Sequence, residues 1–255
     1  APFATGAKVN SLDLAPGDSV PRPTHADWSQ AGYPGTIPDV TSPVIDVREA
    51  GAVGDGVTDD TPAIQAAINN APNPSVILFP VGVYRIESEL DLKSGVVLRG
   101  EGVDSTRIEC RNASGCIRIQ GAIDGGFAAV QSGLAKGSNQ IVVADASEFV
   151  VGQGGQIQQE DILPPEASWG ANAVGQMVKI VTIDGNTLTI DPPLHIDYSL
   201  DKHPEIRPIA YIEQVGIEDL HLKRLSSGSD SDGSNVNIRR AADCWIRRVE
   251  SEWTE

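Results

Sequence analysis

The chain has 255 residues, of which 40% are hydrophobic, and its 35 Asp and Glu against 19 Lys and Arg give a formal net charge of −16. The hydrophobic content is enough for a sizeable core and argues against global disorder, and no apolar run approaches the roughly 20 residues that a membrane-spanning helix needs. The negative charge argues against a nucleic-acid partner, because attraction to phosphates needs a basic surface. With 26 Gly, 17 Pro and only 5% aromatic residues, the composition favours short strands and turns over a helical bundle.

The first 43 residues are rich in proline and contain seven of the 17 prolines of the chain. Proline interrupts long helices and central strands, so we expect residues 1–43 to form an extended arm. Residues 44–121 form the next region, which begins with a short predicted strand at 44–47 and a loop rich in Gly and Asp at 51–60.

A helix is predicted directly after this loop. Asp60 or Thr61 is a suitable N-cap, Pro62 falls in the first turn, and Pro72 ends the helix near residue 71. The apolar residues inside the helix recur at helical spacing and share one face. Five short runs rich in β-branched residues follow, and we predict them to be strands: 76–79, 83–86, 96–98, 107–110 and 117–119.

Residues 122–208 differ in sequence pattern from the regions on either side, and we predict that they form an inserted β-rich module. The dipeptide Asp184-Gly185 is a strong hairpin signal, and residues 160–175 show no periodicity and predict a long loop. Four strands are expected in the module: 141–144, 156–159, 178–183 and 187–190.

The last region, residues 209–255, contains a repeat of 29 residues. Val215–Arg224 aligns with Cys244–Trp253 when it is shifted forward by 29 residues. In this alignment Ile217 matches Ile246, and the two residues that lie three positions after them are also both apolar. Apolar positions that recur at this period are typical of the coils of a solenoid. We therefore expect further coils in this region.

Charged residues of the repeat also match across the shift. Strands about 4.8 Å apart would place them as cross-strand neighbours, and three of the pairs have opposite charges at neutral pH. The matched pairs are Glu218 with Arg247, Asp219 with Arg248, His221 with Glu250, and Lys223 with Glu252.

The segment Val47–Ile68, with its Gly-Ala-Val-Gly-Asp-Gly-Val-Thr-Asp-Asp-Thr-Pro core, and the runs at 77–80 and 82–86 resemble the N-terminal signature of the pectate-lyase-like superfamily. The resemblance implies an all-β fold, a right-handed parallel β-helix (a solenoid) with an N-terminal helical cap at about 61–71. It also implies a secreted or extracytoplasmic protein that binds a polysaccharide. Asp55, Asp59 and Asp60 are expected to cap the helix rather than to act in catalysis.

Polysaccharide lyases of this shape need a group that neutralises the uronate carboxylate, often Ca²⁺ or Arg, and a base. The candidates among the outward residues are Lys223, Arg239, Arg240 and Arg247. The alternative, which the charge pattern favours, is that the basic residues form ladders of salt bridges with their acidic partners. The leading hypothesis is a lyase that cleaves an acidic glycan by β-elimination; the alternatives are a glycoside hydrolase of the same fold and a non-catalytic carbohydrate-binding or structural β-helix.

Two further features concern a metal and a disulfide. Asp230 and Asp232 lie in a polar stretch that resembles a calcium loop only in its oxygen ligands, because the closing Glu and the usual spacing are missing; a flexible turn is the favoured alternative. Cys110 and Cys116 flank a turn-like stretch and are candidates for a disulfide, with Cys244 left free, although three reduced buried cysteines are an equal alternative.

The strand-like sequence pattern continues to Glu255, and no amphipathic helix follows in this sequence that would close a solenoid. Each open end of a solenoid exposes apolar core and a strand edge. We therefore expect a second polypeptide, the C-terminal part of the same precursor, to complete the β-helix and to carry the main catalytic residues.

Overall fold

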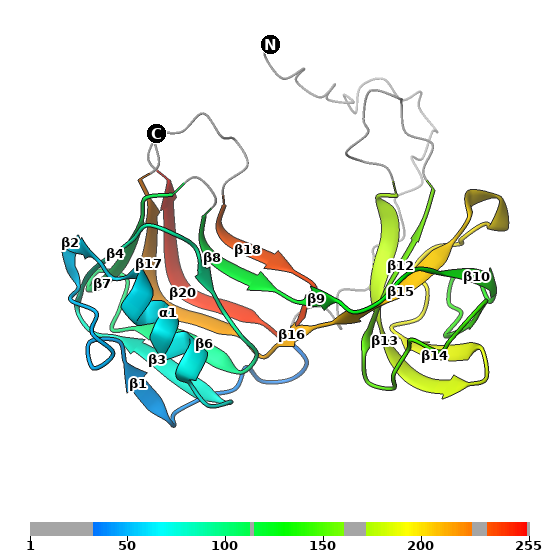
Figure 1. The fold of residues 1–255 in the computed structure, drawn as a ribbon, viewed down its shortest axis with the longest axis horizontal. Helices are drawn as coiled ribbons and strands as arrows, with labels where there is room; N and C mark the ends of the chain where they lie inside the picture. The colour runs from blue at the N-terminus through cyan, green and yellow to red at the C-terminus, as the bar shows by residue number, and fades with distance from the viewer. Residues whose placement is uncertain (1–32, 113–114, 161–171, 226–233, 254–255) are drawn as a thin grey trace, which may run out of the picture. The chain divides into compact units, whose positions relative to one another are not determined.

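A computed structural model describes residues 33–112, 115–160, 172–225 and 234–253. The chain divides into two compact units, residues 1–36 and 37–255, and every described helix and strand belongs to the second (Figure 1). Most of the predicted arm, the Asp230 and Asp232 stretch and most of the predicted 160–175 loop lie outside the described residues. No described helix is long and apolar enough to cross a membrane.

The largest element of the second unit is a curled sheet in which all strand pairs are parallel. Its order is β1-β3-β6-β17-β7-β4-β2, with β20 paired to β17. The strands are β1 (Val44–Asp46), β2 (Asp55–Asp59), β3 (Ser75–Phe79), β4 (Gly82–Ile86), β6 (Val96–Gly100), β7 (Thr106–Cys110), β17 (Gly216–Arg224) and β20 (Trp245–Trp253).

Two smaller parallel sheets complete the coils. One contains β5 (Leu90–Asp91), β8 (Gly115–Gln120) and β18 (Ser234–Arg239), and the other pairs β16 (Ile212–Glu213) with β19 (Ala241–Ala242). Apolar side chains from all the coils, such as Ile77, Leu98, Ile108, Ile117 and Ile217, are fully buried in one core. The expected right-handed parallel β-helix is therefore the fold of this part of the chain.

The 29-residue repeat is confirmed as two neighbouring coils. β17 and β20 pair in parallel with Ile217 opposite Ile246, Leu220 opposite Val249 and Lys223 opposite Glu252. Both strands bend where the repeat aligns Asp219 with Arg248, because these residues have left-handed backbones with φ of 54° and 52°. This bend lets the first part of β17 pair with β6 and its second part with β7.

The predicted helix is α1 (Thr61–Asn70), and its buried Ile64, Ala67 and Ile68 belong to the core of the β-helix. Whether it closes the end of the stack stays a prediction. Asp60 is the N-cap residue, as expected, although its side chain forms no capping hydrogen bond. Asp59 accepts a hydrogen bond from the Thr61 backbone N–H. The Asp60 side chain accepts hydrogen bonds from the backbone N–H groups of Val53 and Gly54, which precede β2. The expectation that Asp55 caps the helix is not met, because its carboxylate accepts bonds from two backbone N–H groups within β2.

Residues 122–210 contain an antiparallel sheet with a hydrophobic core of its own. The hairpin expected at Asp184-Gly185 joins β13 to β14. The strands of this sheet are β9 (Ala122–Ile123), β10 (Ala128–Ser132), β11 (Gln140–Val143), β12 (Gly154–Gln159), β13 (Val174–Asp184), β14 (Thr187–Asp191) and β15 (Glu205–Ala210), and a short 3-10 helix, η3, spans Leu200–Lys202.

Candidate functional site

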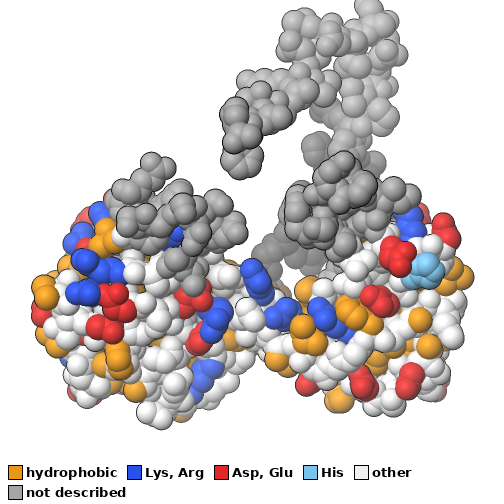
Figure 2. Space-filling model, turned by 45° about the horizontal axis from the view of Figure 1, so that its top comes forward, with side chains coloured by type: hydrophobic (Ala, Val, Ile, Leu, Met, Phe, Trp, Pro, Cys, Tyr) orange, Lys and Arg blue, Asp and Glu red, His pale blue; other side chains and the backbone are white. Residues whose placement is uncertain are grey.

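Outward side chains of the curled sheet form columns, because parallel strands in register place equivalent residues above one another and alternate residues point away from the core. The columns on β4, β6, β7, β17 and β20 contain most of the charged candidates, and we call this surface the ladder face. In Figure 2, basic and acidic side chains lie side by side on the β-helix part of the surface and do not gather into a large patch of one sign.

The first column joins Arg99 of β6, Glu218 of β17 and Arg247 of β20. The Glu218 side chain has no exposed surface, and its two oxygens each lie 2.9 Å from the Nε of one arginine. Asp39 lies 3.5 and 3.6 Å from the same two guanidinium groups. The indole N–H of Trp245 donates a hydrogen bond of 2.6 Å to Glu218.

These contacts determine the ionisation of the buried carboxylate. Burial alone would raise the pKa of Glu218, but the hydrogen bonds from Trp245, Arg247 and Arg99 outweigh burial and hold the pKa below its ordinary value. The expected pairing of Glu218 with Arg247 is confirmed, and the complete burial of the Glu218 side chain is an additional finding. The column does point away from the core, but Trp245 of the next coil covers it, since its ring lies over the bare backbone of Gly216.

The second column alternates in charge from Arg85 through Glu109 and Lys223 to Glu252. Lys223 donates a hydrogen bond of 3.0 Å to Glu252, and this bond is the main reason that the pKa of Glu252 is lowered. Lys223 is thus paired within a ladder and is not a free cation on the surface.

The third column contains Arg107 of β7, His221 of β17 and Glu250 of β20. It borders a hollow of about 370 Å³, whose remaining lining residues are Gly82, Val83, Val103, Asp104 and Ser105. The imidazole of His221 is only 12% exposed. Arginine, histidine and two carboxylates therefore meet in one concave site on the ladder face.

Acidic neighbours from the second column lie close to the basic groups of this hollow, although neither Nε2 of His221 nor Nε of Arg107 forms a hydrogen bond among the described residues. The Nε2 atom of His221 lies 3.3 Å from a carboxylate oxygen of Glu252. The Nε atom of Arg107 lies 3.0 Å from Glu109. An imidazole that borders a hollow beside a carboxylate is a suitable candidate for a group that accepts a proton from a substrate.

The four basic candidates from the sequence do not share one place in the fold. Lys223 and Arg247 belong to two different columns of the ladder face. Arg239 is exposed at the end of β18 in another sheet. Arg240 follows β18, and its Nε donates a hydrogen bond to the backbone oxygen of Gly121.

Sequence reasoning named His221 but did not select Arg107 or Asp104 as site residues. These two lie before the antiparallel sheet of residues 122–210 and His221 lies after it, so no short spacing connects them. For the metal, Asp230 and Asp232 lie outside the described residues, and no group of three or more His, Cys, Asp or Glu suited to a metal ion is found within the described ranges.

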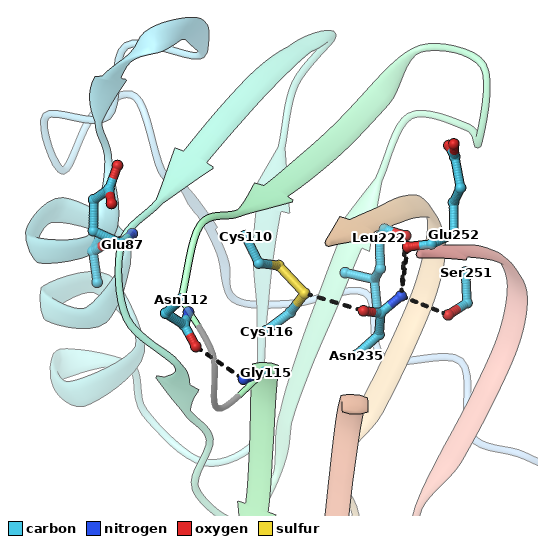
Figure 3. The surroundings of a disulfide bond; sticks show 10 residues. Glu87, Cys110, Asn112, Gly115, Cys116, Leu222, Asn235, Ser251 and Glu252 are labelled. Carbon is cyan, nitrogen blue, oxygen red and sulfur yellow. Dashed lines mark hydrogen bonds between the residues drawn. A yellow bond between two sulfur atoms is a disulfide. The ribbon is translucent and has the colours of Figure 1, made fainter. Parts of the chain in front are cut away.

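Cys110 and Cys116 form a disulfide in the core, between the end of β7 and the start of β8, with Cα atoms 5.4 Å apart (Figure 3). The Sγ atom of Cys116 lies 3.7 Å from the side-chain oxygen of Asn235. The amide nitrogen of Asn235 donates hydrogen bonds to the Ser251 hydroxyl and to the Glu252 backbone oxygen, at 2.8 and 3.0 Å. The disulfide thus packs against a residue that links β18 to β20.

Comparisons with known proteins agree with this architecture. A family model described as "Rhamnogalacturonase A/epimerase, pectate lyase-like" matches residues 44–240. A glucan 1,3-beta-glucosidase of Cochliobolus carbonum is 45% identical over 62 residues, which cover 24% of this chain and 8% of that protein. Mannuronan C5-epimerase AlgE1 of Azotobacter vinelandii is 39% identical over 80 residues, which cover 28% of this chain and 6% of the epimerase. The chain thus spans less than a tenth of the length of these curated relatives.

Among solved structures, the tailspike gp61 of Pseudomonas phage phi297 has a similar fold. Its TM-score is 0.61 at 18% sequence identity, and the likeness covers 82% of this chain and 38% of the tailspike. At this level of identity the likeness concerns the fold alone.

Proposed function

Because the chain belongs to the rhamnogalacturonase A/epimerase family of pectate-lyase-like proteins, we propose that it acts on a uronate-containing polysaccharide and cleaves it by β-elimination at the hollow of the ladder face. The family match confirms the resemblance found in the sequence and supports a carbohydrate as the class of substrate. The β-elimination reaction and the residues that perform it are proposed from the geometry of the hollow.

The observation that carries the proposal is the presence of Arg107 and His221 in one hollow. β-elimination from a uronate begins with removal of the C5 proton, which leaves an enolate-like charge on the carboxylate. Arg107 would neutralise that carboxylate, and His221 would accept the proton. The C4–O bond then breaks, the leaving oxygen takes a proton from water, and the new sugar end contains a C4–C5 double bond.

Glu252 would act as a positioning residue for this chemistry. It lies 3.3 Å from Nε2 of His221 and also binds Lys223. Its carboxylate would hold the imidazole in place at the border of the hollow. Because Lys223 is held by Glu252, it is assigned no direct role in the reaction.

Hydrolysis is a second candidate, because two carboxylates, those of Asp104 and Glu250, border the same hollow. Glycoside hydrolysis uses a pair of carboxylates on either side of the scissile bond, one as acid and one as base or nucleophile. In that case Arg107 would bind the sugar and would not neutralise a developing charge.

The products distinguish the two reactions. The purified protein, together with any companion chain that co-purifies with it, is incubated with polygalacturonate and with alginate, and both ultraviolet absorbance and reducing ends are recorded. We expect absorbance from the unsaturated product, with a rate that falls at least 100-fold in His221→Ala and in Arg107→Gln. His195→Ala and Arg118→Gln, which change residues outside the hollow, serve as matched controls. Reducing ends without absorbance, lost in Glu250→Gln, would indicate hydrolysis. Binding of either polymer without any product would favour a non-catalytic β-helix.

We also propose that a strand of a second polypeptide pairs with β20. Within the described residues β20 pairs only with β17, and Ile246 is 47% exposed whereas its partner Ile217 is fully buried. An open strand edge beside an exposed apolar residue favours pairing with a further strand. Native mass spectrometry of the purified protein tests this: a companion chain is expected, and a monomer that is fully active would contradict it.

We also propose that the protein is located outside the cytoplasm. The disulfide between Cys110 and Cys116 supports it, because disulfides persist in oxidising compartments.

A further inference from the structure

The antiparallel module of residues 122–210 contains two adjoining hollows outside the β-helix. One has a volume of about 300 Å³ and the other about 460 Å³, and Ala129 of β10 lines both. Much of the first hollow is formed by small residues: Gly126, Ala128, Ala129 and Ala144. Small side chains leave room for a ligand close to the backbone, and we call the two hollows, which share Ala129, the groove.

An aromatic ring lies in the wall of this groove. Phe127 is 38% exposed, although it is a large apolar residue. The guanidinium carbon of Arg207 lies 4.5 Å from the centre of its ring, and the same guanidinium group donates two hydrogen bonds to the side chain of Gln156. One face of the ring is therefore covered by a fixed cation, and Phe127 is one of the residues that line the first hollow.

Carboxylates lie next to the ring and are themselves fixed. One oxygen of Glu148 accepts a hydrogen bond of 2.8 Å from the backbone N–H of Gly126, and Asp145 accepts one of 2.9 Å from the backbone N–H of Ser147. The latter bond lowers the pKa of Asp145, so this group is ionised at neutral pH. Fixed carboxylate oxygens are strong acceptors for hydroxyl groups.

The chemistry of these groups selects the ligand. An aromatic ring packs against the apolar face of a sugar ring, and carboxylates accept hydrogen bonds from sugar hydroxyls. Asp145, Glu148 and, in the second hollow, Glu205 would repel a uronate, and the nearby Arg207 is already engaged by Phe127 and Gln156. We propose that the module binds an uncharged polysaccharide along this groove, with Phe127 as the stacking platform and Glu148 as a hydroxyl acceptor.

This proposal does not depend on the proposed cleavage of a uronate polymer, because its residues and its ligand class are different. It is tested by affinity electrophoresis of the 255-residue chain in gels cast separately with dextran, soluble starch, a soluble β-1,3-glucan and a galactomannan. A further gel cast with polygalacturonate tests whether the chain binds an anionic polymer instead. Slower migration than in a gel without polysaccharide measures binding.

At least one of the uncharged polymers is expected to slow the wild-type chain. Phe127→Ala is expected to raise the dissociation constant about tenfold. Glu148→Gln keeps an acceptor for the Gly126 N–H and so preserves the loop, but it is expected to weaken binding several-fold. Val181→Ala changes a residue of the same module that is 44% exposed and lies outside both hollows, and it should bind like the wild type.

Three results would overturn the proposal: no uncharged polymer slows the chain, Phe127→Ala and Glu148→Gln migrate as the wild type does, or polygalacturonate alone is bound. Circular dichroism of each variant verifies folding, and Glu148→Gln gives a result even if Phe127→Ala does not fold. Loss of uronate cleavage with retained binding of the uncharged polymer would contradict the proposed function and leave this inference standing.

Discussion

The Nε atom of Arg247 on β20 lies 2.9 Å from Oε1 of Glu218 on β17, and the Nε atom of Arg99 on β6 lies 2.9 Å from the other oxygen of the same carboxylate. One buried carboxylate therefore joins three neighbouring coils of the β-helix. The two arginines keep 20% and 25% of their side-chain surface exposed. The free-energy cost of burying charge therefore arises mainly from Glu218, whose side chain is fully buried.

The substitution Glu218→Gln should destabilise the fold strongly. Glutamine has nearly the same shape, but its neutral amide would leave the two guanidinium groups facing each other with only Asp39 beside them. Loss of one partner from a buried ion pair costs about 3 kcal/mol. Urea unfolding measures the change, and Glu250→Gln is the control, because Glu250 is exposed and forms no ion pair with a described residue. Equal stability of the two variants would contradict this account of Glu218.

The stability of the β-helix should depend on pH in the acidic range. The pKa of Glu218 in the folded chain lies below its ordinary value of 4.5, and the hydrogen bonds from Arg248 to Asp219 and from Lys223 to Glu252 lower the pKa values of those groups as well. A pKa that is lower in the folded than in the unfolded chain contributes stability above the unfolded value, and this stability is lost as pH falls through the folded value. We expect the melting temperature to fall steadily below about pH 4.5.

The same measurement on Glu218→Gln separates the contribution of this residue. The variant is expected to lose less stability than the wild type between neutral and acidic pH, because it has one fewer carboxylate to protonate. Parallel curves for the two proteins would show that Glu218 does not have the lowered pKa that its hydrogen bonds imply.

The disulfide should contribute measurably to stability despite its short loop. Cys110 and Cys116 are six positions apart, and closure of a loop of this size is worth about 2 kcal/mol in the chain-entropy account. Dithiothreitol should therefore lower the melting temperature of the wild type and of Cys244→Ala alike. It should have no effect on the double variant Cys110→Ala with Cys116→Ala. If Cys244→Ala removed the sensitivity, the free thiol and not the disulfide would be its source.

Gly216 should tolerate no side chain. A Cβ atom there would lie 2.5 Å from the indole ring of Trp245, so Gly216→Ala would push the ring away from Glu218 and expose that carboxylate. We expect a loss of about 2 kcal/mol together with a change in tryptophan fluorescence. Gly126→Ala is the control, because the nearest atom to a Cβ at that position is 3.8 Å away. A stable Gly216→Ala variant with unchanged fluorescence would contradict the assigned packing.

Local features of the sequence predicted the coils well, for a physical reason. Strands that stack in register must match apolar with apolar residues inside and opposite charges outside, so the register of Ile217 with Ile246 and of Lys223 with Glu252 is visible as a 29-residue repeat. The helix was predictable because its start signals and its apolar face are contained in ten residues. The strand β2 was not predicted, because residues 55–59 have the Gly and Asp content of a loop and are ordered by pairing with β4.

The candidate site was harder to predict, because it depends on contacts between coils that are distant in the sequence. Arg107 and His221 are neighbours only because β17 stacks on β7 after the inserted module. The burial of Glu218 depends on Trp245, which reaches it over a glycine of the preceding coil. Neither relationship produces a local periodicity, so the charge pattern alone could indicate ladders but could not show which ladder borders a hollow.

The most direct test of the account is the crystal structure of this chain with a uronate oligosaccharide that is not cleaved, such as the complex of His221→Ala with a tetragalacturonate. We predict that a sugar carboxylate lies within hydrogen-bonding distance of the Arg107 guanidinium group, with the C5 atom of that sugar directed at the position of the removed imidazole. An oligosaccharide bound elsewhere on the molecule, with the hollow between β7 and β20 empty, would contradict the assignment of the ladder face as the site of reaction.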